Sequence, residues 1–164
     1  MLMGVAGAGK TTVGRALAAV LGWPFIEGDD FHPAANVEKM LRGVPLSEAD
    51  RRPWLLRLRE EIRRCVGAGH DAVVACSALK ASHRDVLKVE GAQTRFVLLG
   101  APQRLIRGRL TRRPGHFMPA GLLDSQIEAL EVPADALALD ARRPVPELVA
   151  SIREALGLNG GQGG

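Results

Sequence analysis

One stretch near the start of the chain has the residue types and the spacing needed to bind a polyphosphate. It reads Gly4-Val5-Ala6-Gly7-Ala8-Gly9-Lys10-Thr11-Thr12 and fits the pattern Gly-x-x-x-x-Gly-Lys-[Ser/Thr]. Glycines let the backbone N–H groups of such a loop turn inward, so that phosphates approach closely. Lys10 would lie along the β- and γ-phosphates, and the Thr11 hydroxyl would take one place on a bound Mg²⁺. The loop therefore predicts a site for a nucleoside triphosphate.

We expect this nucleotide to be held by the loop as a whole, with Lys10 as a catalytic residue and Thr11 as the metal ligand. The predicted contacts are Gly4, Ala6, Gly7, Ala8, Gly9, Lys10, Thr11 and Thr12. The competing interpretation is a glycine-rich loop that only turns a strand into a helix.

The loop must be positioned by a strand before it and a helix after it. A helix is predicted from Lys10 to Leu21, because apolar residues recur there at the spacing of one helix face and Gly22 can end it. The free N–H groups at the start of this helix would face the same phosphates. Upstream stand only residues 1–3, fewer than the about five or six of a usual strand. Either the first strand is a stub or the natural chain starts further upstream.

Strands and helices are predicted to alternate along the rest of the chain. Further strands are expected at 24–27, 71–76, 95–99 and 136–140, and helices at 34–41, from 47–50 to 66 with Pro53 in its first turn, and at 81–89, 102–111, 120–130 and 146–156. This alternation is typical of an α/β fold with a parallel sheet covered by helices on both faces. We expect five strands in one domain over residues 1–158, followed by a disordered glycine-rich tail at 159–164.

Composition limits the classes of protein that fit. The chain has 164 residues, of which 46% are hydrophobic and 24% charged, as is ordinary for a soluble globular domain. It has no apolar run near the about 18 residues that span a bilayer and no signal segment, so we expect a cytoplasmic protein without a membrane partner. The net charge is +4, but the arginines are scattered among acids, so no nucleic-acid partner is expected. Cys65 and Cys76 form no metal or disulfide framework and are predicted to be buried thiols.

Several further motifs, in order along nearly the whole chain, resemble those of one family. They are Gly28-Asp29-x-x-His32-Pro33, Asn36-x-x-Lys39-Met40, Gly43-x-Pro45-Leu46, Asp50-Arg51-x-Pro53-Trp54-Leu55, Cys76-Ser77-Ala78-Leu79-Lys80, Arg84, Arg109-Leu110-x-x-Arg113-x-Gly115-His116-Phe117 and Gln126-x-x-x-Leu130-Glu131-x-Pro133. With the phosphate loop, they are similar to the motifs of the small gluconate kinases. Ala6 and Ala8 stand where this family usually has serines, but the backbone donors of the loop survive either change.

The resemblance implies a P-loop NTPase fold in three layers, like that of shikimate and nucleoside monophosphate kinases, with a small mobile lid at about residues 109–125. It implies transfer of the γ-phosphoryl group of ATP to the 6-hydroxyl of D-gluconate, with ATP and Mg²⁺ as cofactors. It also implies a possible homodimer. The competing hypotheses are a kinase of another aldonic acid or of shikimate, and a nucleotide-binding module without turnover.

Two residues at the end of the second predicted strand are candidates for the reacting end of the acceptor. Asp29 is expected to accept or orient the proton of the attacking hydroxyl, because ligands bind at the carboxyl ends of parallel strands. An outer Mg²⁺ contact or a helix cap is the alternative. His32 could bind the acceptor's hydroxyls or have a structural role. Asp30 is expected to be solvated.

Three cations are candidates for the acidic end of the acceptor. Arg51 is expected to hold the gluconate carboxylate, because a guanidinium binds a carboxylate through two parallel hydrogen bonds. Lys80 and Arg84, which follow the third strand, could add positive charge near the sugar acid. A surface arginine at a helix start is the alternative for Arg51.

Two arginines are candidates for the nucleotide. Arg113, beside Pro114-Gly115, is expected to ride on the lid and to stabilise the charge of the transferring phosphoryl group as a catalytic residue. Arg109 is expected to pack on the adenine or reach its phosphates. A solvated basic helix end is the alternative for both. The strand at Val73-Val74 does not end in the aspartate of a second NTPase motif, which argues against a GTPase or a motor ATPase.

Overall fold

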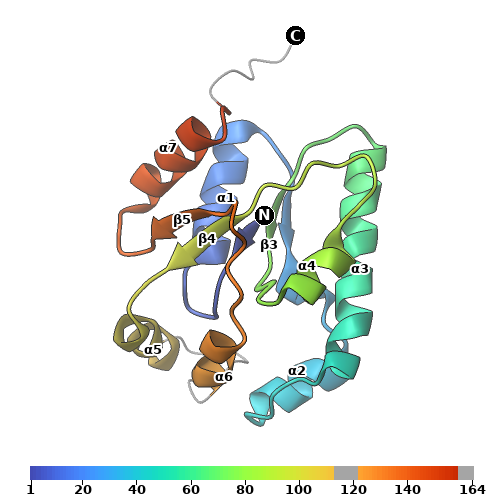
Figure 1. Cartoon of the computed structure of the whole chain (residues 1–164), viewed down its shortest axis with the longest axis vertical. Helices are drawn as coiled ribbons and strands as arrows, with labels where there is room; N and C mark the ends of the chain where they lie inside the picture. The colour runs from blue at the N-terminus through green and yellow to red at the C-terminus, as the bar shows by residue number, and fades with distance from the viewer. Residues whose placement is uncertain (113–121, 159–164) are drawn as a thin grey trace.

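A computed structural model describes residues 1–112 and 122–158 of the chain. Its strands are β1 (Leu2–Met3), β2 (Phe25–Glu27), β3 (Val73–Ala75), β4 (Val97–Gly100) and β5 (Leu137–Asp140). Its helices are α1 (Lys10–Leu21), the 3-10 helix η1 (Gly28–Phe31), α2 (Ala34–Leu41), α3 (Glu48–Gly67), α4 (Ala81–Leu87), α5 (Gln103–Thr111), α6 (Leu123–Glu128) and α7 (Val145–Ala155). Figure 1 shows them as one α/β unit.

All five strands run parallel, in the order β2-β3-β1-β4-β5, which confirms the predicted sheet. The shortest strand, β1, is therefore the central one, with Leu2 beside Ala75 of β3 and Val97 of β4. The carboxyl ends of all five strands point to one edge of the sheet, where the loops after them gather.

Successive residues of β1 face opposite sides of the sheet and begin two separate cores. Leu2 packs with Leu17 of α1 and Ile152 of α7 on one face. Met3 packs on the other face in a cluster that includes Trp54 and Leu58 of α3. Helices thus cover both faces, as the alternation of elements predicts, and the buried strands explain the continuous apolar runs in the sequence.

Helix α3 begins within the predicted range 47–50, but Pro53 does not lie in its first turn. Ser47 is its N-cap, and the side chains of Ser47 and Asp50 each bond the other residue's backbone N–H in a capping box. Because the box starts the helix at Glu48, Pro53 lies in the second turn and not in the first. This start sets Glu48 and Arg51 on the first turn, facing the edge of the sheet where the strands end.

Two smaller features also differ from expectation. Residues 28–31, to which the sequence analysis assigns no helix or strand, form the short helix η1, which begins directly after β2. Cys76 is buried as predicted, and burial raises the pKa of its thiol to about 12, but Cys65 is only partly buried. Within the described ranges, no helix is long and apolar enough to cross a membrane.

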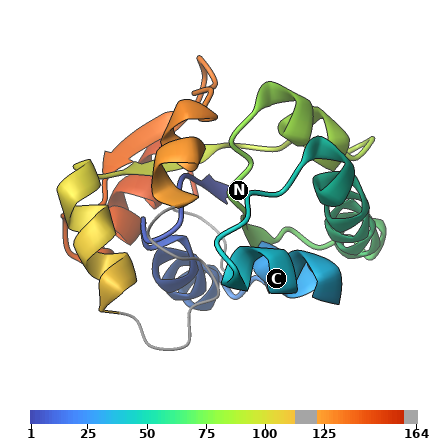
Figure 2. The ribbon, with the colours of Figure 1, turned by 90° about the horizontal axis from the view of Figure 1, so that it is seen from below.

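The lower end of the molecule in Figure 1 is formed by helices from distant parts of the chain. Figure 2, seen from below, shows α5 and α6 on one side and α2 with the start of α3 on the other. Residues 113–121, in the middle of the lid predicted at 109–125, lie outside the described residues.

Candidate active site

The phosphate loop connects β1 to α1 and takes its shape from glycines in the left-handed region. Gly4 has a φ of 133°, and a Cβ there would lie 2.7 Å from the backbone oxygen of Leu99. The need for glycine at this position is thus imposed by the neighbouring strand β4, and not by the ligand as the sequence analysis assumes. Gly9, at φ 98°, is the N-cap of α1, and a Cβ there would meet no atom within 4 Å.

Lys10 bends back over this loop. Its Nζ donates a hydrogen bond to the backbone oxygen of Val5 at 3.0 Å. The ammonium group therefore lies over the phosphate loop. In this position it would neutralise charge on the β- and γ-phosphates.

Glu27, the last residue of β2, is a member of the site for which the sequence analysis proposes no role. Its carboxylate lies near the Thr11 hydroxyl, which follows Lys10 at the start of α1. Burial raises the pKa of Glu27, while the Thr11 hydroxyl acts in the opposite direction. Its position at the carboxyl end of a strand is a sequence signal for a site residue, although the sequence analysis assigns a role only to the nearby Asp29.

Asp29 lies on η1 and lines a cleft together with Lys10 and Thr11. The indole Nε1 of Trp54 donates to the backbone oxygen of Gly28 at 2.7 Å, which fixes η1 against α3. Sequence reasoning therefore places Asp29 correctly beside the phosphate loop. Asp30 is exposed, as expected.

His32 is held against the same wall of the cleft. Its ring stacks on Trp54 with centroids 4.0 Å apart and planes 18° apart, and its Nδ1 lies 3.4 Å from the Nδ2 of Asn36. Its Nε2 lies 3.9 Å from Oδ1 of Asp29. Burial lowers the pKa of His32 to about 4, so the ring is neutral near pH 7. The ring is thus packed as a structural residue while its edge faces the carboxylate of Asp29.

Arg51 is far from the phosphate loop in the sequence, yet it lines the same cleft. Its Nη1 donates to the backbone oxygen of Leu46 and lies 3.6 Å from Oε1 of Glu48. Glu48 also accepts a hydrogen bond from Nζ of Lys80 at 2.9 Å. The hydrogen bond from Lys80 is the largest of the causes that hold the pKa of Glu48 at about 2, so Glu48 is an anion among cations. Lys80 thus reaches the site through Glu48 and does not line the cleft itself.

Arg84 is not brought to the cleft. The side chain is buried, and its Nη1 donates to the backbone oxygens of Ala78 at 2.9 Å and Leu79 at 3.1 Å. Ala78 has a φ of 43°, a left-handed conformation that costs free energy in a residue with a Cβ. Arg84 therefore stabilises the turn after β3 through these hydrogen bonds, a role that the sequence pattern alone does not reveal.

Arg109 lies beside a second hollow on the other side of the phosphate loop. This hollow is lined by Gly7, Gly9, Thr12 and Val145 as well as Arg109, whose Nη2 donates to the backbone oxygen of Ala141 at 2.9 Å. The base of a nucleotide whose phosphates are bound in the loop would therefore have this hollow next to it. Arg113, the predicted catalytic arginine of the lid, lies outside the described residues, as do His116 and Phe117.

These groups can bring a polyphosphate and an acidic alcohol together. The start of α1 supplies free N–H groups, Asp29 supplies a base or an orienting acceptor, and Arg51 supplies a guanidinium of the kind that binds carboxylates. All three line one cleft, to which Leu122 and Gln126 from the α6 region also contribute. The arrangement fits phosphoryl transfer from a nucleotide to a small hydroxy acid.

Comparisons with known sequences agree with this chemistry. A sequence model of the family described as AAA domain matches residues 1–133. The chain is 53% identical over 135 residues to the gluconokinase of Gluconobacter oxydans, which covers 82% of this chain and 76% of that protein. It is 41% identical over 160 residues to the thermosensitive gluconokinase of Escherichia coli, covering 95% and 86% of the two chains.

Solved structures with a similar fold include two sugar kinases. A sugar kinase from a Janibacter species is 40% identical with a TM-score of 0.89, covering 96% of this chain and 93% of that one. A gluconokinase from Sinorhizobium meliloti is 38% identical with a TM-score of 0.79, covering 98% and 95%. Shikimate kinase from Bacteroides thetaiotaomicron, at 23% identity and a TM-score of 0.65 over 95% and 96% of the two chains, shares the fold alone.

Proposed function

The chain belongs to the gluconokinase family of P-loop kinases, and we propose that it transfers the γ-phosphoryl group of ATP to the 6-hydroxyl of D-gluconate, giving 6-phospho-D-gluconate. The observation that carries this proposal is the single cleft that joins Lys10, Asp29 and Arg51. A linear acid that is held by its carboxylate at one end presents an alcohol at the other.

ATP binding follows from the loop and from the hollow beside Arg109. The free N–H groups at the start of α1 would offer partial positive charge to the phosphates, whereas the N–H of Ala6 is bonded to Gln126 in this structure. Lys10 would exchange its bond to Val5 for the phosphates. Adenine would occupy the hollow lined by Arg109 and Val145.

The oxygen donors next to the loop fit a Mg²⁺ ion. Thr11 offers its hydroxyl, and the carboxylates of Glu27 and Asp29 lie near it. Among the described residues there is no group of three or more His, Cys, Asp or Glu side chains that could hold a metal alone. Mg²⁺ typically binds through few protein oxygens together with phosphates and water, so Thr11 would hold it with the nucleotide present. The ion would supply positive charge to the β- and γ-phosphates.

Asp29 is proposed to accept the proton of the 6-hydroxyl as that oxygen attacks phosphorus. His32 supports this role, because its neutral ring is fixed by Trp54 and its Nε2 lies 3.9 Å from the carboxylate of Asp29. His32 would thus help to orient the carboxylate of Asp29. Contacts of His32 with the substrate stay a prediction.

Arg51 is proposed to bind the gluconate carboxylate. Its guanidinium is only partly used by Leu46 and Glu48, so other N–H groups can face the cleft. Lys80 forms an ion pair with Glu48, which also lies next to Arg51. The two cations and the ionised Glu48 together carry a net charge of +1. One carboxylate neutralises this cluster.

Several finer points stay predictions of the same proposal. Arg113 would stabilise the charge on the transferring group, from a lid at about 109–125 within a single domain over residues 1–158. Sedimentation velocity would test the possible homodimer that the family resemblance implies.

A coupled assay of ADP release tests the function directly. We expect ATP turnover that depends on gluconate and is much weaker with other aldonic acids, shikimate or nucleoside monophosphates. Lys10→Ala should abolish it, whereas Lys88→Ala, which removes a lysine paired with Asp85 on the exposed surface, should not. Binding of ATP without ADP release for any acceptor would contradict the proposal and favour a non-catalytic module.

A further inference from the structure

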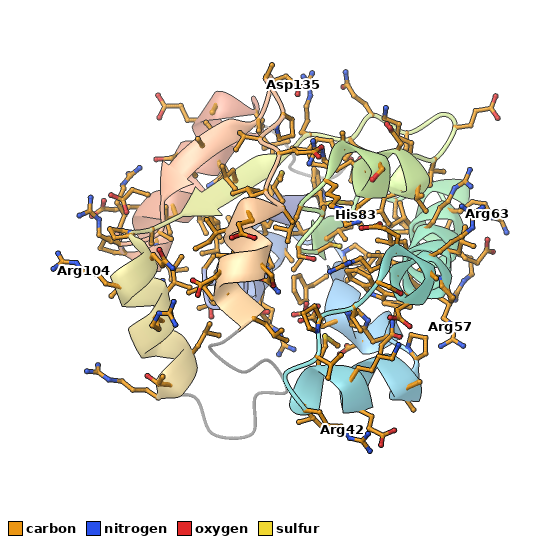
Figure 3. All side chains as sticks on the ribbon, turned by 60° about the horizontal axis from the view of Figure 1, so that its bottom comes forward. Arg42, Arg57, Arg63, His83, Arg104 and Asp135 are labelled. Carbon is orange, nitrogen blue, oxygen red and sulfur yellow. The ribbon has the colours of Figure 1, made fainter. Side chains whose placement is uncertain are left out.

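His83 is a buried histidine in the cleft to which neither the phosphate loop nor the carboxylate site assigns a role. It lies on α4, is 4% exposed, and lines the same cleft as Asp29 and Arg51. Figure 3 shows it in the middle of the molecule, whereas the labelled Arg42, Arg57 and Arg104 extend from the periphery. A buried polar side chain that faces a binding cleft requires a hydrogen-bonding explanation.

One of its ring nitrogens is paired with an acidic side chain. Nε2 of His83 lies 2.9 Å from Oε2 of Glu48, whose pKa is held at about 2. Glu48 is therefore ionised at neutral pH and can only accept a hydrogen bond. It follows that Nε2 carries the proton and donates to Glu48.

The ring as a whole is neutral, since burial lowers the pKa of His83 more strongly than the bond to Glu48 raises it. Arg51 and Lys80, the charged groups of α3 and of the turn before α4 that face the ring, act in the same direction as burial. A neutral imidazole with its proton on Nε2 has a lone pair on Nδ1. His83 is thus an acceptor at Nδ1.

This acceptor has no partner within the described part of the chain, where the only side-chain hydrogen bond of His83 is the one from Nε2. It is not sealed in the interior either. Among the described residues, Arg153 alone has a fully enclosed side-chain nitrogen or oxygen without a partner. The Nδ1 atom of His83 is therefore not fully enclosed, and the residue that carries it lines the cleft.

We infer that His83 is a further substrate-positioning residue, whose Nδ1 accepts a hydrogen bond from a hydroxyl of the sugar acid, and that Glu48 sets this tautomer. The inference rests on the proposed function, because it takes a polyol acid as the ligand. A carboxylate is not the partner, since it has no proton to donate and is repelled by the lone pair. An alcohol between the carboxylate at Arg51 and the reacting end at Asp29 has the required donor.

This contact would select for the hydroxyl-bearing chain. A site with a fixed acceptor discriminates against an analogue that lacks the matching hydroxyl, because the buried acceptor is then left without a partner. Glu48 contributes by acting through His83, since it keeps the proton on Nε2 and leaves Nδ1 as the acceptor.

The test compares gluconate with its 2-, 3-, 4- and 5-deoxy analogues in the wild-type enzyme and in His83→Phe. For one analogue we expect wild-type kcat/KM to fall roughly three- to tenfold, the effect of one lost neutral hydrogen bond. In His83→Phe the same analogue and gluconate should be used equally well, because the two changes remove the same contact and are not additive. The KM for ATP should not change.

His70→Phe is the matched control, because His70 is exposed in the loop after α3 and is not among the residues that line the cleft. Equal ratios of gluconate to every analogue in wild type and His83→Phe would overturn the inference. Absence of gluconate turnover in the wild type would instead contradict the proposed function.

Nitrogen-15 NMR of the imidazole gives a second measurement that needs no His83 variant. In the wild type we expect an unprotonated Nδ1 whose resonance shifts when gluconate saturates the enzyme. Glu48→Ala should redistribute the proton between the two nitrogens and raise the KM for gluconate more than it lowers kcat. A proton on Nδ1 in the wild type, or a resonance that gluconate leaves unchanged, would overturn the inference.

Discussion

The side-chain Oε1 of Gln126 accepts a hydrogen bond from the backbone N–H of Ala6 at 2.7 Å, which ties α6 to the phosphate loop across 120 positions of sequence. Ala6 is 9% exposed, so its N–H has little access to water in place of this partner. Because Gln126 follows the predicted lid, the contact connects the end of the lid directly to the loop that holds the nucleotide.

Gln126→Leu removes the acceptor without a large change of volume. We expect the free energy of unfolding to fall by about 1–3 kcal/mol, the usual cost of a buried donor left without a partner, and the KM for ATP to rise. Urea unfolding and steady-state kinetics measure the two effects. Gln103→Leu is the control, because Gln103 is exposed on α5 and bonds only Asp124 among the described side chains. Equal effects of the two variants would show that the tie is unimportant.

Asp29→Asn keeps the size of the side chain and removes its basicity. If Asp29 takes the proton of the acceptor hydroxyl, kcat should fall roughly 100-fold or more, with the fold and ATP binding retained. Asp30→Asn is the matched control, because Asp30 is the exposed neighbour on the same short helix. Near-normal kcat in Asp29→Asn would remove this residue from the mechanism.

Arg51→Ala should raise the KM for gluconate roughly 10- to 100-fold, the range for a lost charged hydrogen-bond pair, while the KM for ATP stays the same. Arg51→Lys should recover little, because a lysine cannot bind a carboxylate through two parallel bonds. Arg52→Ala, which changes the exposed next residue of α3, serves as the control. A loss of ATP affinity instead would place the carboxylate elsewhere.

Arg113→Ala should lower kcat roughly 100-fold or more if this arginine stabilises the transferring phosphoryl group. Binding of ATP and gluconate should change much less, because the interaction forms chiefly in the transition state. Arg112→Ala, at the C-cap of α5, is the neighbouring control. Single-turnover kinetics measure the chemical step, and an unchanged rate would leave Arg113 as surface charge.

The buried histidines predict a loss of stability in mild acid. The pKa of His32 is lowered to about 4, below the about 6.5 of an unfolded chain, so between these values the unfolded state binds more protons. The free energy of unfolding should therefore decrease as pH falls from 6.5 toward 4, by an amount on the order of 3 kcal/mol at most. Burial shifts the pKa of His83 in the same direction.

Urea unfolding at several pH values between about 7 and 5 tests this. His32→Gln should flatten the dependence, because the amide has no proton to take up, while His70→Gln, an exposed histidine, should not. An equally steep decline in His32→Gln would assign the acid sensitivity to other groups.

Local patterns in the sequence predict the scaffold well. Helix α2 spans Ala34–Leu41 as expected, and α1 ends at Gly22 in the left-handed conformation that favours glycine. Helix α3 begins at Glu48, inside the predicted range 47–50, but the capping box at Ser47 puts Pro53 in the second turn, whereas proline alone suggests a first-turn position.

The site is less predictable where distant segments meet. Arg84 and Lys80 look alike in sequence as cations after β3, yet one is buried against carbonyl groups and the other reaches a carboxylate of α3. Glu48 and His83 lie 35 residues apart and form a pair only after α3 packs on α4. Periodicity and motifs report faces and ends of elements, whereas such pairs depend on the packing of one element against another.

The loop that binds ATP is connected to β1, a strand of two residues in the centre of the sheet. Catalysis and folding therefore share a small set of backbone hydrogen bonds, those that join β1 to β3 and β4. A ligand that immobilises the loop would also slow the exchange of these central amide protons with solvent. Bound nucleotide would therefore stabilise the whole sheet against local opening.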